Sequence, residues 1–466
     1  MYRPLLILLI LGGLLRLLTM VLYFPTALQW IDVVRFSRIG PWHSFFSDYY
    51  MPAGYAVFLK ITHALSSDVA LTVSVQHLLG LGGGVLVYGA IRRTQVPRWL
   101  ALLPTAVLVL GGDQLYLEHI MMNDFLFMFL LTAGFCTAMY GLLPRPRLRV
   151  LALASLIFAV AGLTRQTGLA GLPVLGLCAF LARDGGLRPR FTALLCGVIP
   201  GVILVVAYAV AANAIGTYSG LTDMGGWNLY ARVAPFADCR DFTPPSGTSK
   251  LCEMTPSGLR NGPFWYAWEQ QSRGQSLLGL ATPANGRLPG DFARAVVENQ
   301  PLDYLHAIVK DFSRYADPNV GTIRAWAGEG PETVSFEQGQ VDPTTSRSLQ
   351  QNLAGYWTGL RPHLVGVQIL DAYQSATRII GGLWWALWAL ALFAIVAASR
   401  TARIGALMFG LTAFLLYLLP VMSLSWDWRY GVPAQYTLVA SATFGAWTLL
   451  DRATRRRRSQ QPQPLT

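Results

Sequence analysis

The residues of this sequence best suited to chemistry are charged side chains at the ends of long apolar stretches. A carboxylate at such a boundary can take a proton from a hydroxyl group. An arginine there presents a fixed fork of N–H donors that fits phosphate oxygens. The residues of these kinds that we single out are Asp32, Glu118, His119, Asp124, Arg165 and Arg429.

The composition indicates that lipid is the solvent of much of the chain. The 466 residues are 53% hydrophobic and only 13% charged, whereas a soluble domain carries about 25% charged residues. The net charge of +12 would suit a nucleic-acid binder. However, the basic residues form short runs between apolar stretches, as topology signals do. We therefore expect no nucleic-acid partner.

Apolar stretches of about 18 residues or more predict helices that cross the ~30 Å hydrocarbon core of a bilayer. We expect an all-α polytopic membrane protein with about ten such spans, the fifth and sixth being short. The spans are predicted near Leu5–Phe24, Val69–Ile91, Leu100–Leu117, Phe125–Leu143, Val150–Leu163, Gly168–Leu181, Ala193–Ala212, Gly381–Ala398, Ile404–Met422 and Tyr430–Leu449.

Every second connection between these stretches is rich in arginine. By the positive-inside rule these connections and both termini face the cytoplasm, and the others face outward from the plasma membrane. An amphipathic pattern after Pro52 predicts interfacial helix in the first outer loop. The predicted regions are a transmembrane module at 1–214 with its first outer loop at 25–68, an extracytoplasmic segment at 215–378, C-terminal transmembrane helices at 379–450, and a basic cytoplasmic tail at 451–466.

Two of the five cysteines, Cys239 and Cys252, lie in the long polar segment and could close a small loop. If that segment is extracytoplasmic, a disulfide bond between them is expected, because such bonds persist in oxidising compartments. Free thiols or a metal site are the alternatives, and the lack of a nearby His or further Cys disfavours metal.

Each charged candidate also has a purely structural interpretation. Asp32 could cap the helix that follows it. Glu118 and Asp124 could be solvated turn residues. Arg165 could extend to lipid headgroups, and Arg429 could pair with Asp427. Arg16, inside the first apolar stretch, is interpreted as structural or as the partner of a buried acid, because a charge there usually faces the bundle interior.

Four segments resemble the GT-C superfamily of membrane glycosyltransferases, which includes the protein mannosyltransferases and the aminoarabinose transferases. They are the early acid Asp32 with the entry Pro52-Ala-Gly-Tyr55, the segment Tyr116–Leu126, the turn Gly162–Gly168, and the segment Ser425–Pro433. A further segment, Asp303–Lys310, resembles a helix that precedes the late spans in bacterial members. Many members carry two adjacent acids where this sequence has Asp32 alone.

The resemblance implies roles for these residues. Asp32 would be the catalytic base, and Asp124, Glu118 and His119 would bind the acceptor or a metal. Arg165, Arg429 and Lys310 would bind the phosphate of a polyprenyl-phosphate-linked sugar. No cofactor is certain, and a divalent metal would fit only if Asp32 and Asp124 converge.

The expected reaction is inverting transfer of the sugar to a hydroxyl of a cell-envelope acceptor (glycan, lipid or protein) on the extracytoplasmic side. The partners would then be the lipid-linked donor, that acceptor and membrane lipid. Two alternatives remain: a transporter or flippase of lipid-linked glycan, and a noncatalytic envelope-assembly protein. A transporter would favour ionisable residues midway along several spans.

Overall fold

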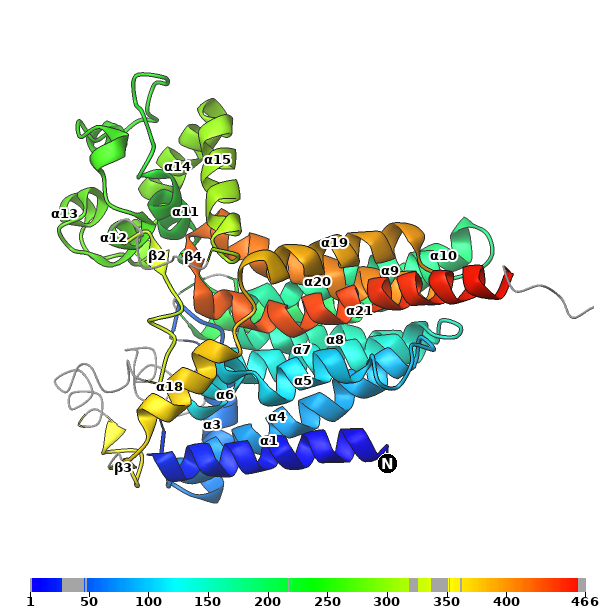
Figure 1. The fold of residues 1–466 in the computed structure, drawn as a ribbon. Helices are drawn as coiled ribbons and strands as arrows, with labels where there is room; N and C mark the ends of the chain where they lie inside the picture. Colours follow the sequence, from blue (N-terminus) through cyan, green and yellow to red (C-terminus); the bar gives the residue numbers. More distant parts are fainter. Residues whose placement is uncertain are drawn as a thin grey trace, which may run out of the picture.

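Long helices lie side by side in a bundle, and a smaller helical lobe stands at one end of it (Figure 1). This computed structural model describes residues 2–26, 46, 48–216, 218, 220–317, 326–336, 351, 353–360 and 363–459. The beginning of the first helix and the end of the last both lie toward the end of the bundle away from the lobe (Figure 1). Asp32 lies outside the described residues.

The bundle is built from helices whose apolar residues can face lipid while their backbone groups bond internally. Its main helices are α1 (Arg3–Leu22), α4 (Val69–Arg92), α5 (Leu102–Leu110), α7 (Asn123–Leu142), α8 (Leu148–Thr164), α9 (Gly171–Ala182), α10 (Leu187–Ile215), α19 (Gly381–Ala397), α20 (Arg400–Ser423) and α21 (Trp428–Ser459).

Within the described part of the chain, five helices are long and apolar enough to cross a membrane: α1, α4, α7, α10 and α20. A sixth candidate is the bent pair formed by α18 (Val367–Ala376) and α19, whose axes differ by 46°. The apolar helices at Leu148–Thr164 and Gln166–Ala182 are shorter. The structure is thus that of a helical membrane protein, and the total of ten spans stays a prediction.

One predicted span is divided. The stretch Leu100–Leu117 forms two helices, α5 and α6 (Gly112–His119), separated by the extended residue Gly111. A Cβ atom at Gly111 would lie 2.4 Å from the carbonyl oxygen of Val107, so glycine is what allows the chain to turn there. The prediction of one continuous span was wrong because hydropathy alone does not register such a break.

Short connecting elements close the lobe-facing end of the bundle. Helix α3 (Gly54–Leu65) occupies the position of the predicted interfacial helix, and the 3-10 helix η2 (Gln166–Ala170) joins α8 to α9. Strands β1 (Tyr23–Phe24) and β3 (His363–Leu364) pair antiparallel, and β2 (Gly328–Glu329) and β4 (Trp426–Asp427) pair parallel.

The lobe has a hydrophobic core of its own, formed around the buried side chains of Trp227, Tyr230 and Phe292. Its helical elements are α11 (Gly225–Val233), η3 (Ser249–Leu251), η4 (Ser257–Leu259), α12 (Pro263–Trp268), α13 (Arg273–Leu278), η5 (Pro283–Asn285), α14 (Arg287–Asn299) and α15 (Pro301–Ser313). Hydrogen bonds help to fix it to the rest of the chain: the Tyr50 hydroxyl donates to Ala281 O (3.0 Å) and the Tyr304 hydroxyl to Met422 O (2.9 Å).

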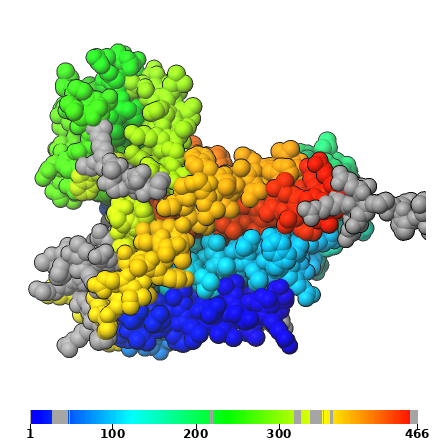
Figure 2. All heavy atoms as spheres, viewed as in Figure 1, coloured from blue at the N-terminus to red at the C-terminus, as the bar shows by residue number. Residues whose placement is uncertain are grey.

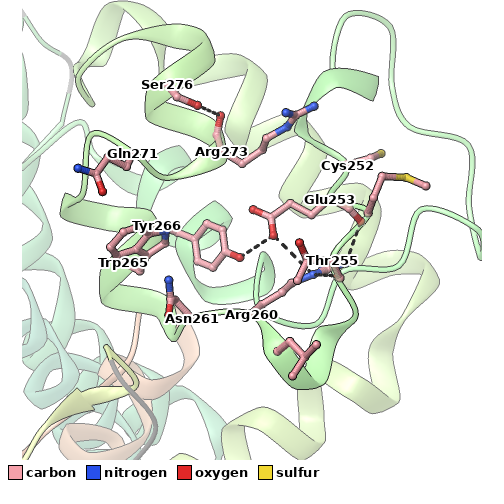
Figure 3. Close-up of a pocket in the computed structure, with 12 residues that line it drawn as sticks. Cys252, Glu253, Thr255, Arg260, Asn261, Trp265, Tyr266, Gln271, Arg273 and Ser276 are labelled. Atoms are coloured by element: carbon pink, nitrogen blue, oxygen red, sulfur yellow. Dashed lines mark hydrogen bonds and ion pairs between the residues drawn. The ribbon is translucent and has the colours of Figure 1, made fainter.

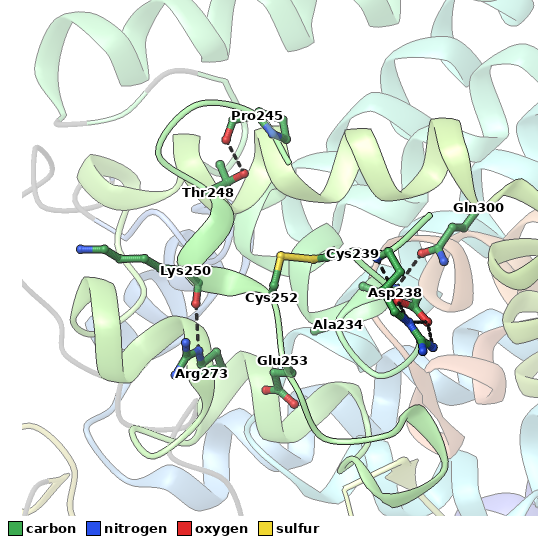
Figure 4. Close-up of a disulfide and its surroundings, with 12 residues drawn as sticks. Ala234, Asp238, Cys239, Pro245, Thr248, Lys250, Cys252, Glu253, Arg273 and Gln300 are labelled. Carbon is green, nitrogen blue, oxygen red and sulfur yellow. Dashed lines mark hydrogen bonds and ion pairs between the residues drawn. A yellow bond between two sulfur atoms is a disulfide. The ribbon is translucent and has the colours of Figure 1, made fainter. Parts of the chain in front are cut away.

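A disulfide bond joins Cys239 and Cys252 within the lobe (Figure 4). The two residues are 13 apart in sequence, and their side chains pack on the hydrophobic core of the lobe. The bond closes the irregular loop between α11 and η3, where few regular backbone hydrogen bonds are available.

The disulfide is expected to stabilise the lobe without affecting the bundle. The double substitution Cys239→Ser, Cys252→Ser should lower the free energy of unfolding of the lobe by about 2–4 kcal/mol, because the open loop gains conformational freedom when unfolded. Hydrogen exchange should become faster in α11 and α14 and stay unchanged in α7 and α8. Equal protection of the lobe in both proteins would contradict the assignment, and Cys136→Ser serves as the control.

Candidate active site

A cavity of about 160 Å³ lies where the bundle end meets the lobe. Several distant segments line it: the chain before α3, the start of α7, the turn between α8 and η2, the end of α20, the start of α21, and α11 of the lobe. Its lining residues are Tyr50, Met51, Pro52, Asn123, Arg165, Gln166, Thr167, Asn228, Pro420, Ser423, Leu424, Arg429 and Tyr430. Two predicted phosphate-binding residues, Arg165 and Arg429, are therefore brought together.

Arg165 enters the cavity from the point where α8 stops. Its backbone is extended, and its N–H donates to Ala161 O (2.9 Å) while its carbonyl accepts from Gly168 N–H (2.8 Å). The guanidinium carbon lies 4.3 Å from the ring centre of Tyr430. Burial lowers the pKa of Arg165 to about 10, so the side chain remains a cation at neutral pH.

Asp124 lies in the first turn of α7 and is fully buried. Its carboxylate contacts the Arg165 guanidinium and lies 4.0 Å from Arg429 Nε. The N-terminal end of a helix also favours a negative charge. Asp124 thus connects the two guanidinium groups, whose mutual repulsion it offsets.

Arg429 is held at the start of α21 by its neighbours in sequence. Its backbone N–H donates to Asp427 Oδ1 (2.8 Å), and its Nη2 lies 3.6 Å from Asp427 Oδ2. Its guanidinium carbon lies 5.3 Å from the Tyr430 ring centre. Two cations therefore stand around one aromatic ring at the cavity wall, an arrangement that can bind a phosphate through several N–H donors.

Asp113 supports this wall, although sequence reasoning missed it. Its carboxylate accepts from Trp428 Nε1 (2.8 Å), from Gln374 Nε2 (2.8 Å) and from Arg378 Nε (3.2 Å). Asp113 therefore holds the side chain of Trp428, the residue before Arg429, in place. The sequence did contain a signal for Asp113: an acid inside the predicted span Leu100–Leu117 is costly in lipid and requires partners.

Glu118 and His119 do not line the cavity. The Glu118 carboxylate accepts from Arg16 Nε and Nη2 (2.7 Å each) and from Gln114 Nε2 (2.9 Å), and His77 Nδ1 lies 3.1 Å away. Gly80 leaves space for it, because a Cβ there would lie 2.1 Å from Glu118 Oε1. The expectation that Arg16 pairs with a buried acid is confirmed. These contacts give Glu118 a structural role, and its predicted role in binding an acceptor or a metal stays a prediction.

His119 closes a hydrogen-bonded chain. Its Nε2 donates to Tyr23 O, and its Nδ1 lies 3.2 Å from Nε2 of His77. The two rings therefore link the Glu118 carboxylate to the backbone carbonyl of Tyr23, just after α1.

Lys310 lies elsewhere. It lines a separate cavity of about 270 Å³ in the lobe that shares no lining residue with the one at Arg165 and Arg429. The structure therefore does not bring Lys310 together with the two arginines.

A divalent metal does not fit the described residues. Among them there is no group of three or more His, Cys, Asp and Glu side chains placed to hold an ion. Two guanidinium groups beside Asp124 would also repel a cation at that carboxylate. Because Asp32 lies outside the described residues, its predicted convergence with Asp124 is untested.

A larger cavity of about 540 Å³ lies inside the lobe (Figure 3). Its central charges are engaged in local structure. Glu253 accepts a hydrogen bond from the Tyr266 hydroxyl (3.0 Å), and Arg260 donates to Ala234 O and Ala237 O (3.0 and 2.7 Å). The smaller cavity at the bundle end is therefore the better candidate for an active site.

Neither a protein-family model nor a curated protein matches the chain. Among solved structures, the apo Archaeoglobus fulgidus oligosaccharyltransferase is similar, with a TM-score of 0.46 and 11% identity, over 98% of this chain and 52% of that one. The same protein tethered to an acceptor peptide gives a TM-score of 0.42 at 11% identity, over 100% of this chain and 52% of that one. ArnT from Cupriavidus metallidurans bound to undecaprenyl phosphate gives 0.34 at 15% identity, over 99% of this chain and 80% of that one.

These structural neighbours are membrane glycosyltransferases of the GT-C superfamily. The chain spans about half the length of the oligosaccharyltransferase.

A structural role for Glu118 predicts a large loss of stability when its charge is removed. Glu118→Gln should cost about 3–5 kcal/mol, because it leaves the buried Arg16 without its counter-charge. Gln114→Ala removes one hydrogen bond from an uncharged donor to the same carboxylate and should cost less, about 1.5–3 kcal/mol. Thermal unfolding in lipid discs measures both. A Glu118→Gln protein as stable as the wild type would show that the contact with Arg16 is not structural.

Proposed function

We propose that the protein is a membrane glycosyltransferase that moves a sugar from a polyprenyl-phosphate donor to a hydroxyl acceptor outside the membrane. The observation that carries this proposal is the convergence of Arg165 and Arg429 at the cavity between the bundle end and the lobe. A phosphate attached to a lipid chain can reach such a cavity from the bilayer while its sugar points toward the lobe.

The proposed reaction is a single displacement. The acceptor oxygen attacks the anomeric carbon, and the bond between that carbon and the phosphate oxygen breaks with inversion. The leaving polyprenyl phosphate takes the electron pair. Arg165 and Arg429 would stabilise the charge that develops on it, because preorganised cations act where charge forms. Asp124 would be a positioning residue that holds both guanidinium groups in place.

The base that removes the acceptor proton is proposed to be Asp32. This assignment rests on the resemblance of the first outer loop to that of the GT-C superfamily, since Asp32 lies outside the described part of the chain. The acceptor would be a glycan, a lipid or a protein of the cell envelope, and the lobe contributes Asn228 to the cavity that it would enter.

The sidedness is part of the proposal. The beginning of α1 and the end of α21 lie toward the end of the bundle away from the lobe (Figure 1), and the arginine-rich connections predict that this side is cytoplasmic. The lobe and the cavity would then be extracytoplasmic, in the compartment where a disulfide such as Cys239–Cys252 persists.

The principal rival is a transporter of a lipid-linked glycan. Its favoured signature, ionisable residues inside the bundle, is met here by Arg16, His77 and Glu118. However, these residues are buried and bonded to one another, and none of them lines the cavity at Arg165 and Arg429. A noncatalytic assembly protein is the second rival, and it differs in needing no acidic residue at position 32.

Loss of either arginine should weaken donor binding. Arg165→Gln and Arg429→Gln should each raise the dissociation constant for a polyprenyl phosphate about 10- to 100-fold, the value of a charge-assisted hydrogen bond. Arg294→Gln, on the exposed face of α14, is the matched control and should bind as the wild type does. Titration of the lipid into protein in lipid discs measures the constants. Unchanged binding in both cavity variants would refute the phosphate site.

Replacement of Asp32 tests the reaction itself. Asp32→Asn should bind donors normally but lose sugar transfer by at least about 100-fold, because a general base typically contributes 10²–10⁴ in rate. Wild type and variant would be offered a panel of radiolabelled polyprenyl-phosphate sugars, and release of the sugar to acceptor or water would be followed. Full activity of the variant would remove Asp32 from the mechanism. Movement of intact donor across vesicles, without sugar release, would favour the transporter.

A further inference from the structure

Helix α15 presents an apolar stripe on the surface of the lobe. Leu302, Leu305 and Val309 are 78%, 54% and 59% exposed, and their spacing places them on one face of the helix. The other side of the helix is packed, since Ile308 and Asp311 are buried and Tyr304 bonds to Met422 O. Three large apolar side chains in a row on one exposed face mark a surface that contacts something apolar.

The end of α15 lies at the depth of a tryptophan cluster. Phe312 packs against Trp384 and Trp388 in the first turns of α19, with ring centres 5.5 and 6.2 Å away. The neighbouring Trp385 is 53% exposed on the outside of the bundle. Tryptophan gathers at the boundary between lipid and water, so this cluster indicates where the outer membrane surface meets the protein.

Leu305 lies seven residues before Phe312 and therefore on the same face of α15 as the ring that contacts Trp384 and Trp388. The helix runs across the long axis of the bundle and extends beyond its side, with the other lobe helices on its far side (Figure 1). The space-filling view shows the same light-green edge standing over open space alongside the bundle (Figure 2). A bilayer around the bundle would fill that space up to the surface of α15.

The side of α15 that faces the 270 Å³ cavity, which we call the flank, carries basic side chains that could bind a lipid headgroup. Arg232, Lys310 and Arg314 line the 270 Å³ cavity beside the helix, together with Asp303 and Asp311. Asp311 is already engaged, because Arg232 contacts it and Arg314 Nη1 lies 2.9 Å from it. Within the described residues, Lys310 has no ion-pair partner, and Nε and Nη2 of the buried Arg232 have no hydrogen-bond partner.

We propose that α15 lies in the outer membrane surface, with its stripe among the acyl chains and its flank binding the phosphate of an anionic phospholipid. Amphipathic surface helices bind membranes through two contributions: the burial of apolar area, and the attraction of basic side chains to anionic lipid. Lys310, which lies apart from Arg165 and Arg429, then has a role separate from the donor. The proposal stands whether or not the protein transfers sugars.

Lipid-borne quenching tests the stripe. A bimane label would be placed on Leu305→Cys or Val309→Cys in full-length protein carrying Cys136→Ala and Cys196→Ala, reconstituted with phospholipids brominated in their acyl chains. Met254→Cys, an exposed apolar position elsewhere in the lobe, is the matched control. Both stripe labels should be quenched several-fold more than the control. Equal quenching would overturn the proposal, and labels shielded from both lipid and aqueous iodide would indicate a protein partner instead.

Headgroup selectivity tests the flank. At equal mole fraction, brominated phosphatidylglycerol should quench the label at position 305 more than brominated phosphatidylcholine does. Lys310→Gln should abolish the difference, whereas Lys250→Gln, an exposed lysine elsewhere in the lobe, should not. A difference that disappears when inorganic phosphate is added would assign the cavity to free phosphate. Equal quenching by the two lipids in the protein that retains Lys310 would refute the headgroup site.

Discussion

The contact between Asp124, Arg165 and Arg429 is the interaction on which the lobe-facing end of the bundle depends. A carboxylate buried at the start of α7 is tolerable only with cationic partners, and these come from the end of α8 and the start of α21. Three segments separated by long stretches of sequence are thus required to meet at one point. Both guanidinium groups line the cavity beside this junction.

A second buried cluster shows how the same residue types serve architecture. Glu118 joins α6 to α1 through Arg16 and to α4 through His77, and it is surrounded on all sides by donors. Arg165 and Arg429 differ in that they line a cavity. Burial and charge alone therefore do not separate structural from functional residues. Access to an open space beside the charge does.

The features that the sequence predicted well are local ones. Apolar stretches gave the positions of α1, α4, α7 and α20, and the need to neutralise Arg16 pointed to an acidic partner. The break at Gly111 escaped prediction because it depends on one carbonyl contact within the stretch. The separation of Lys310 from the two arginines also escaped, because the sequence does not say which face of the lobe meets the bundle. Asp32 remains a sequence-based hypothesis.

Photochemical crosslinking of the lipid phosphate would test the central claim most directly. A polyprenyl phosphate carrying a diazirine next to the phosphate would be bound to the protein in lipid discs, irradiated, and its adducts located by mass spectrometry. The account predicts adducts in the peptides that contain Asn123, Gln166 and Tyr430, reduced by Arg429→Gln. Adducts confined to the middle of the spanning helices, with none at these three residues, would contradict a phosphate site at the bundle end and favour a transport pathway.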